Sequence, residues 1–201
     1  MMKRRCPHCG DKSPAPILYG MPAFGPELEQ KIADHKIVLG GCVLIEGAPE
    51  YYCFHCKKEV GSPAILISKH GVEKYEDIIT SIRFRYGSIQ IGYKVVELKK
   101  AGDSFSLDVF SYLTNFREFH RELKQDEWKQ TISTLYDKLY LHEWKKRYVD
   151  PCVMDGDEGE LEIKLTDRRI RTYSGLNAYP ALWDELKAVF RPFFTEAGIK
   201  F

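Results

Sequence analysis

Cys6-Pro7-His8-Cys9-Gly10 and Cys53-Phe54-His55-Cys56 decide the N-terminal fold, because each stretch holds a Cys-x-x-Cys pair. A two-residue gap lets both sulfurs of a tight turn bind one ion, and two such turns supply the four ligands of a closed structural Zn²⁺ site. Gly10 supports this reading, since the chain leaving such a turn commonly needs a positive φ. A redox dithiol and unrelated thiols are the alternatives. The predicted ligands of one Zn²⁺ per chain are Cys6, Cys9, Cys53 and Cys56.

The remaining cysteines, and the histidines inside the two turns, are not expected to bind the metal. His8 and His55 are expected to point to solvent, because the middle residues of such a turn usually face away from the metal. Cys42 lies in the apolar run of residues 37–45 and is expected to be a small buried side chain, as is Cys152. Cys42 as a substitute ligand is the alternative.

The segment between the two cysteine pairs is longer than a minimal ribbon needs and predicts structure of its own. The expected elements are a strand at 17–19, a helix at 26–34 with Pro26 in its first turn, a strand at 38–45 and a return strand at 50–53. This pattern indicates a zinc ribbon with a helical insertion over residues 1–61. Gly61-Ser62-Pro63 marks the boundary to a second domain over residues 62–201.

Several short strings in this segment resemble the zinc-ribbon head of uncharacterised bacterial proteins. The resemblance covers about residues 6–58 and rests on the strings CPHCG, YGMP, VLGGCV and YYCFHC. Gly175-Leu176-Asn177-Ala178-Tyr179-Pro180, followed by a Trp-Leu helix, also resembles a segment of such proteins. The resemblance implies a bacterial zinc-binding protein and carries no activity with it. Lys57 stands where the first turn has Gly10, so the second turn is expected to be less regular.

The second domain predicts an antiparallel sheet with two helices packed on one face, which makes the whole chain α+β. Alternating patterns predict strands at 83–86, 89–98 and 105–112, then at 142–148, 161–166 and 169–173. Helical spacing of Trp128, Ile132, Leu135 and Leu139 predicts a helix of about four turns from Asp126. A final helix is expected from Pro180. The order suggests a duplicated βββα unit as one interpretation of this domain.

Composition restricts the function classes. The chain of 201 residues has 44% hydrophobic and 29% charged residues, which is typical of a globular protein. Its net charge of +1 gives no overall attraction for nucleic acid. The start lacks an apolar signal region and no run approaches 18 apolar residues, so the prediction is a cytoplasmic protein without a membrane partner.

The best-supported role from sequence is a binding or adaptor module whose partner, a protein or a nucleic acid, contacts the surface near the ribbon. Tyr51, Tyr52 and Phe54 are available there for stacking. The candidate contact residues are the basic ones that flank the cysteine pairs, Arg4, Arg5, Lys57 and Lys58.

Two other function classes stay open. A metal-dependent nuclease would use an Asp with a Glu-x-Lys pattern, here Asp150, Asp155, Glu162 and Lys164. The alternative, which the alternating pattern favours, is that Glu160, Glu162 and Lys164 form the solvated side of a hairpin. A structural subunit of a larger assembly is the third class. Catalytic activity is not expected, because the sequence holds neither a nucleophile signature nor a dinucleotide fingerprint.

Overall fold

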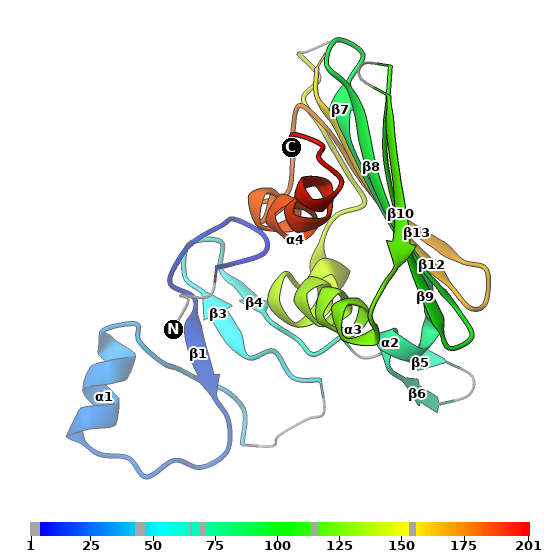
Figure 1. The fold of residues 1–201 in the computed structure, drawn as a ribbon. Coiled ribbons are helices and arrows are strands. Elements are labelled where there is room, and N and C mark those ends of the chain that lie inside the picture. Colours follow the sequence, from blue (N-terminus) through cyan, green and yellow to red (C-terminus); the bar gives the residue numbers. More distant parts are fainter. Residues whose placement is uncertain (1–4, 43–46, 65, 69–70, 114–115, 153–155) are drawn as a thin grey trace.

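The fold is α+β, as predicted, and contains two main β-sheets (Figure 1). The computed structural model describes residues 5–42, 47–64, 66–68, 71–113, 116–152 and 156–201. A small N-terminal sheet has the strand order β2-β1-β3-β4, and a larger sheet has the order β10-β9-β8-β7-β12-β13-β11. A separate hairpin joins β5 (Leu66–Ser68) to β6 (Gly71–Glu73), ahead of the short helix α2 (Tyr75–Ile78).

The N-terminal sheet carries a helical excursion. Its elements are β1 (Ala15–Leu18), α1 (Pro26–Ala33), β2 (Val38–Leu39), β3 (Tyr51–Cys53) and β4 (Lys58–Val60). The crossover through α1 makes β1 and β2 parallel, whereas β3 pairs antiparallel with both β1 and β4. The strand expected at 38–45 is observed only as β2, and residues 43–45 of it lie outside the described residues. Figure 1 shows α1 on the outer side of this sheet, away from the other helices.

The larger sheet is antiparallel except at one edge, where β11 pairs parallel with β13. Its strands are β7 (Ile79–Ser88), β8 (Gly92–Ala101), β9 (Ser104–Tyr112), β10 (Arg117–Glu122), β11 (Arg147–Val149), β12 (Glu158–Leu165) and β13 (Ile170–Leu176). β12 lies between β7 and β13, so the hairpin expected around residues 167–168 joins the meander directly. That hairpin was predicted correctly from the alternation of apolar and polar residues.

Several elements differ from the sequence prediction, including β4, β5, β6 and α2, which were not predicted. The sequence pattern did not predict β10, because its residues REFHRE contain one apolar side chain and the strand lies at an edge. The stretch predicted as a strand at 142–148 is a 3₁₀ turn (Leu141–Glu143) followed by the short β11. The helix from Gln125 ends as α3 at Ser133 and continues as one π-helical turn (Thr134–Lys138).

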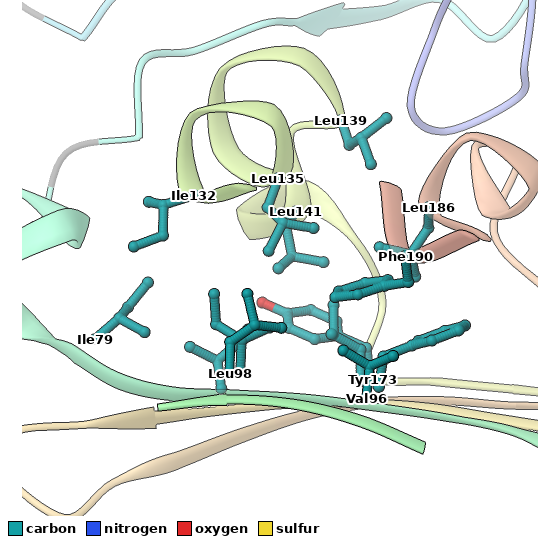
Figure 2. Close-up of a cluster of buried hydrophobic side chains, with 14 of the residues drawn as sticks. Ile79, Val96, Leu98, Ile132, Leu135, Leu139, Leu141, Tyr173, Leu186 and Phe190 are labelled. Atoms are coloured by element: carbon teal, nitrogen blue, oxygen red, sulfur yellow. The ribbon is translucent and has the colours of Figure 1, made fainter. Parts of the chain in front are cut away.

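Both long helices, α3 (Gln125–Ser133) and α4 (Trp183–Glu196), contribute to one buried cluster with the larger sheet (Figure 2). Phe84 of β7 stacks on Phe190 of α4 with ring centroids 4.6 Å apart, and Phe105 of β9 packs against Trp128 of α3. Figure 2 shows side chains of both helices above Val96 and Leu98 of β8. Among the described residues, four strands of this sheet precede α3 and three more lie between α3 and α4. The duplication of a βββα unit stays a prediction.

Two glycines of the larger sheet leave room for two stacked aromatic rings at the start of α4. Gly159 of β12 lies opposite Gly175 of β13 in the register of the sheet. A Cβ atom on Gly159 would lie 2.1 Å from the Trp183 ring, and one on Gly175 would lie 2.5 Å from a backbone oxygen. Tyr179 stacks on Trp183 at 4.6 Å and donates a hydrogen bond to the Asp157 carbonyl. The loop before α4 therefore packs against the sheet. Helix α4 begins at Trp183, three residues later than the predicted start at Pro180.

Arg121 joins β10 to both long helices. Its guanidinium donates hydrogen bonds to both carboxylate oxygens of Glu127 in α3 and to both of Glu196 in α4, at 2.8–3.0 Å. The hydrogen bonds from Arg121 lower the pKa of Glu127, more than burial raises it. Two-point arginine–carboxylate contacts are among the stronger polar contacts in proteins.

Replacing Arg121 by Ala is expected to lower the free energy of unfolding near pH 7 by about 1 kcal/mol, a value that allows for solvent screening. Because the pKa of Glu127 is lower in the folded state, its contribution exists above the unfolded-state pKa and disappears as the pH falls through the folded-state value. Urea unfolding near pH 7 and at about pH 3 checks this. At about pH 3 the unfolding free energy of Arg121→Ala should equal that of the wild type. The control Arg117→Ala, at an exposed position, should change the unfolding free energy little at either pH.

Candidate metal centre

The four predicted cysteine ligands come together at one point of the N-terminal sheet. Their Sγ atoms all lie within 4.8 Å of one another. The Sγ atoms of Cys6 and Cys56 are 3.7 Å apart, and those of Cys9 and Cys53 are 3.5 Å apart. A tetrahedral Zn²⁺ with bonds of about 2.3 Å to sulfur places its ligands roughly 3.8 Å from one another, whereas a disulfide needs about 2.05 Å. All four thiols are free, so they are positioned to bind a metal ion.

The first pair lies in a tight turn whose backbone closes on itself. The N–H of Gly10 donates to the Cys6 carbonyl at 2.9 Å, and the N–H of Cys6 donates to the Asp11 carbonyl at 2.8 Å. Gly10 has φ +77°, the left-handed conformation expected after such a turn. A Cβ at this position would lie 3.3 Å from that of Ala181, so the turn also packs closely against the segment before α4.

The second pair lies in the hairpin between β3 and β4, where Cys53 pairs with Lys58. Lys57 has φ +56°, so it occupies the same left-handed position as Gly10 in the first turn. The missing glycine therefore does not change the shape of the turn. It means instead that a residue with a Cβ holds a backbone conformation that favours glycine.

Lys57→Gly is expected to stabilise the metal-bound turn by about 0.5–1 kcal/mol, because relief of the left-handed strain exceeds the added freedom of the unfolded chain. This corresponds to roughly two- to fivefold tighter metal binding. Competition with a chromophoric zinc chelator measures it. Lys57→Ala removes the same charge but keeps the Cβ, and it should bind zinc as the wild type does. Equal tightening in both variants would show that charge, not backbone strain, is responsible.

The four thiols of the cluster differ in how far they are buried. Cys6 and Cys53 are completely buried, while Cys9 and Cys56 are partly exposed. Burial raises the pKa of both Cys6 and Cys56. Burial also opposes ionisation of Cys9, but the backbone N–H of Asp11 and the neighbouring Cys53 thiol outweigh it and lower its pKa to about 7. A divalent cation among the sulfurs would favour the thiolate form of all four.

Two carboxylates, those of Glu185 and Glu143, connect the first cysteine turn and the chain after β4 to the rest of the molecule. Arg5, next to the first ligand, forms an ion pair with Glu185 of α4. The half-buried Glu143 accepts hydrogen bonds from the N–H groups of Gly61 and Ser62 at 2.9 and 3.1 Å. Its other oxygen lies 3.4 Å from Nε2 of His8 in the first turn. The sequence analysis singled out neither Glu185 nor Glu143, because no spacing pattern links them to the cysteines.

The other sequence-predicted residues near the ribbon are only partly where they were expected. His8 and His55 are outside the sulfur cluster, and both are exposed residues. The prediction that Cys42 and Cys152 are buried is wrong, since both lie at exposed positions in loops. Cys42 is not a member of the cluster formed by the described residues.

The predicted basic surface is smaller than the sequence suggested. Arg4 lies outside the described residues. Arg5 is held by Glu185 and therefore contributes little free positive charge. Lys57 and Lys58 are exposed beside the second turn, with Tyr52 and Phe54 close by.

The described members of the acidic set considered for a nuclease, Asp150, Glu162 and Lys164, do not form a cluster that could hold a metal ion. Glu162 of β12 forms an ion pair with Arg83 of β7 at 3.4 Å, on the sheet face opposite the buried Leu161 and Ile163. Lys164 follows on the same face, while Asp155 lies outside the described residues. The carboxylate of Asp150 accepts a hydrogen bond from the N–H of Cys152 in its own turn. The described members thus resemble the ion-paired face of a sheet.

A cavity of about 780 Å³ lies between α3 and α4, and Arg5 and Glu185 bound it. Apolar side chains such as Leu182 and Phe193 line part of it. The hydroxyls of Thr131 and Thr134 in its wall donate to carbonyls of their own helix. The polar groups of the wall are thus largely used within the protein, and we assign no ligand to this cavity.

The fold and the site define an α+β protein with a four-cysteine cluster positioned to bind a metal ion. Comparisons with protein-family models, with curated proteins and with solved structures found no match. Within the part of the chain that the structure describes, no helix is long and apolar enough to cross a membrane.

Proposed function

We propose that the chain binds one structural Zn²⁺ through Cys6, Cys9, Cys53 and Cys56, and that it works as a zinc-stabilised binding module. The observation that carries the zinc assignment is the near-tetrahedral spacing of four free sulfurs, two of them completely buried. Four sulfur ligands favour zinc over the oxygen-seeking cations. They also leave no open coordination position for water or substrate, which favours a structural metal over a catalytic one.

Surface features of residues 1–61, which we propose to be the zinc-ribbon domain, support a protein partner. No residue of α1 is buried. Met21 and Phe24, ahead of this helix, are 89% and 66% exposed. Such a set of apolar side chains beside a metal-held sheet is typical of a protein-binding surface. The further exposed apolar residues of this domain are Leu18, Leu39 and Phe54.

Metal analysis tests the zinc assignment. Elemental analysis of the untagged protein should find one zinc per chain. The double variant Cys53→Ser, Cys56→Ser should lose or greatly weaken zinc binding, because it removes half of the ligands. The matched control is Cys42→Ser, which removes an exposed thiol outside the cluster and should retain the metal. A wild-type protein without zinc, or a double variant that keeps it fully, would refute the assignment.

Nucleic acid is the alternative partner, and it depends on the charges of Lys57 and Lys58. A nucleic-acid complex would weaken steeply with salt and would be lost in the double variant Lys57→Gln, Lys58→Gln. With a protein partner, fluorescence anisotropy with single-stranded oligonucleotides should show no binding that depends on these two lysines. Lysine-dependent, salt-sensitive binding would favour the nucleic-acid alternative.

A further inference from the structure

The side chain of Glu143 touches both segments that carry the cysteine pairs. One carboxylate oxygen accepts hydrogen bonds from the N–H groups of Gly61 and Ser62, at 2.9 and 3.1 Å. These two residues directly follow β4, the strand that leaves the second cysteine turn. The other oxygen lies 3.4 Å from Nε2 of His8, which lies inside the first cysteine pair. One carboxylate of the larger part of the chain therefore connects the two turns.

A 3₁₀ turn brings Glu143 into this position. The sequence predicted a strand at 142–148, and a strand places neighbouring side chains on opposite faces. In the observed turn (Leu141–Glu143) the side chains of His142 and Glu143 instead reach the same segment. Nε2 of His142 donates a hydrogen bond to the carbonyl of Ser62 at 2.9 Å. Together the two side chains bind both N–H groups and one carbonyl of Gly61 and Ser62.

Buried neighbours hold the turn that carries Glu143. Leu141 is completely buried and Trp144 is buried beside it. The indole N–H of Trp144 donates to the carbonyl of Leu139 at 2.8 Å, and its ring packs edge-on against Tyr173 of β13. A side chain on a well-packed element positions its partners more precisely than one on a loose loop. The larger sheet thus presents the carboxylate to the cysteine turns from a fixed support.

The second oxygen of Glu143 is unfavourable to bury. It is inaccessible to solvent and has no hydrogen-bond partner among the described residues. Burial raises the pKa of the Glu143 carboxyl, more than the N–H groups of Gly61 and Ser62 lower it. A buried carboxylate oxygen without a hydrogen bond opposes folding. Core packing therefore does not account for a glutamate here, whereas its contact with both cysteine-bearing segments does.

We propose that Glu143 is a positioning residue of the metal site, which holds the two cysteine turns at the separation that one ion requires. This inference rests on the proposed Zn²⁺ assignment. The cysteine pairs are far apart in the sequence, so bringing them together costs chain entropy. A contact that holds both turns offsets part of this cost. Because folding and metal binding are coupled in such sites, the contact adds to the metal affinity.

Competition with a chromophoric zinc chelator tests the proposal in the full-length protein. Glu143→Ala should bind zinc at least about tenfold more weakly, which is the order expected for the loss of two hydrogen bonds to a carboxylate. Glu143→Gln keeps an oxygen that accepts from Gly61 and Ser62, and it should recover most of the affinity. The matched control is Glu127→Ala, which removes a carboxylate that binds Arg121 of β10 and should leave zinc affinity unchanged.

The rate of zinc transfer to the chelator is a second readout. It should rise in Glu143→Ala and stay at the wild-type value in Glu127→Ala. A wild-type protein without zinc would refute the zinc assignment and this inference with it. If the wild type holds one zinc and Glu143→Ala binds it equally tightly, the positioning role alone is wrong. An equal loss in Glu127→Ala, or in Glu143→Gln, would also overturn that role, because it would show a general loss of stability or an effect of charge.

Discussion

Removing the metal with a chelator is expected to unfold strands β1 to β4 while the larger sheet remains folded. The cluster around the sulfurs has few buried members, namely Cys6, Cys53 and Val60, and two of these are proposed metal ligands. Helix α1 adds no buried residue. Zinc binding to small four-ligand sites supplies about 10–16 kcal/mol near neutral pH, far more than this apolar burial. We therefore expect the N-terminal sheet to depend on the metal for its stability.

Hydrogen exchange measured by mass spectrometry locates the effect. After chelation, peptides that cover β3 and β4 should lose protection, and peptides that cover β7, β8 and β9 should keep it. A smaller increase is expected near Glu143 and Glu185, which contact Gly61, Ser62 and Arg5. Uniform loss of protection across the chain would contradict independent folding of the larger sheet. Unchanged protection in β3 and β4 would contradict a structural metal.

Phe190→Ala is expected to cost about 3–5 kcal/mol of unfolding free energy in the part of the chain that contains the larger sheet. Phe190 is completely buried, and its ring stacks on Phe84 at an interplanar angle of 7°. Truncation removes the contact between α4 and the centre of the sheet and leaves a cavity, because the strand backbone cannot move to fill it. The loss is comparable to the total stability of many domains of this size.

Urea unfolding followed by far-ultraviolet circular dichroism measures this loss in the zinc-loaded protein. Phe190→Leu keeps most of the side-chain volume and should cost less than about 1.5 kcal/mol. The difference between the two variants isolates the contribution of the cavity and the ring contact. A loss below about 1 kcal/mol for Phe190→Ala would contradict the central role of this residue in the core.

Sequence patterns predicted the features that depend on short-range spacing. Cys-x-x-Cys spacing identified all members of the sulfur cluster, and alternation identified the hairpin of β12 and β13. Alternation failed for β10, where Phe119 is the single apolar residue of an edge strand. It failed also for Cys42, whose apolar neighbours suggested burial although the loop leaves it exposed. Burial depends on what packs against a segment, which a local pattern does not contain.

Contacts between distant segments required the tertiary structure. Gly159 and Gly175 accommodate the rings of Tyr179 and Trp183 only because β12 and β13 lie side by side beneath the start of α4. Exposed apolar residues of the β7–β8 and β9–β10 connections likewise lie at one level, because the strands that they join pair in register. No single stretch of sequence shows either group.

The sequence by itself determined the local chemistry of this protein: two thiol pairs positioned to bind one cation, and alternating segments that form a sheet. Ligand spacing and side-chain alternation act over a few residues, so they can be read directly from the chain. The tertiary structure alone decided that Glu185 neutralises Arg5, that Glu143 holds the segment after β4, and that the apolar hairpin ends meet. Those outcomes depend on strand order and register, which arise from packing of the whole chain rather than from any local preference.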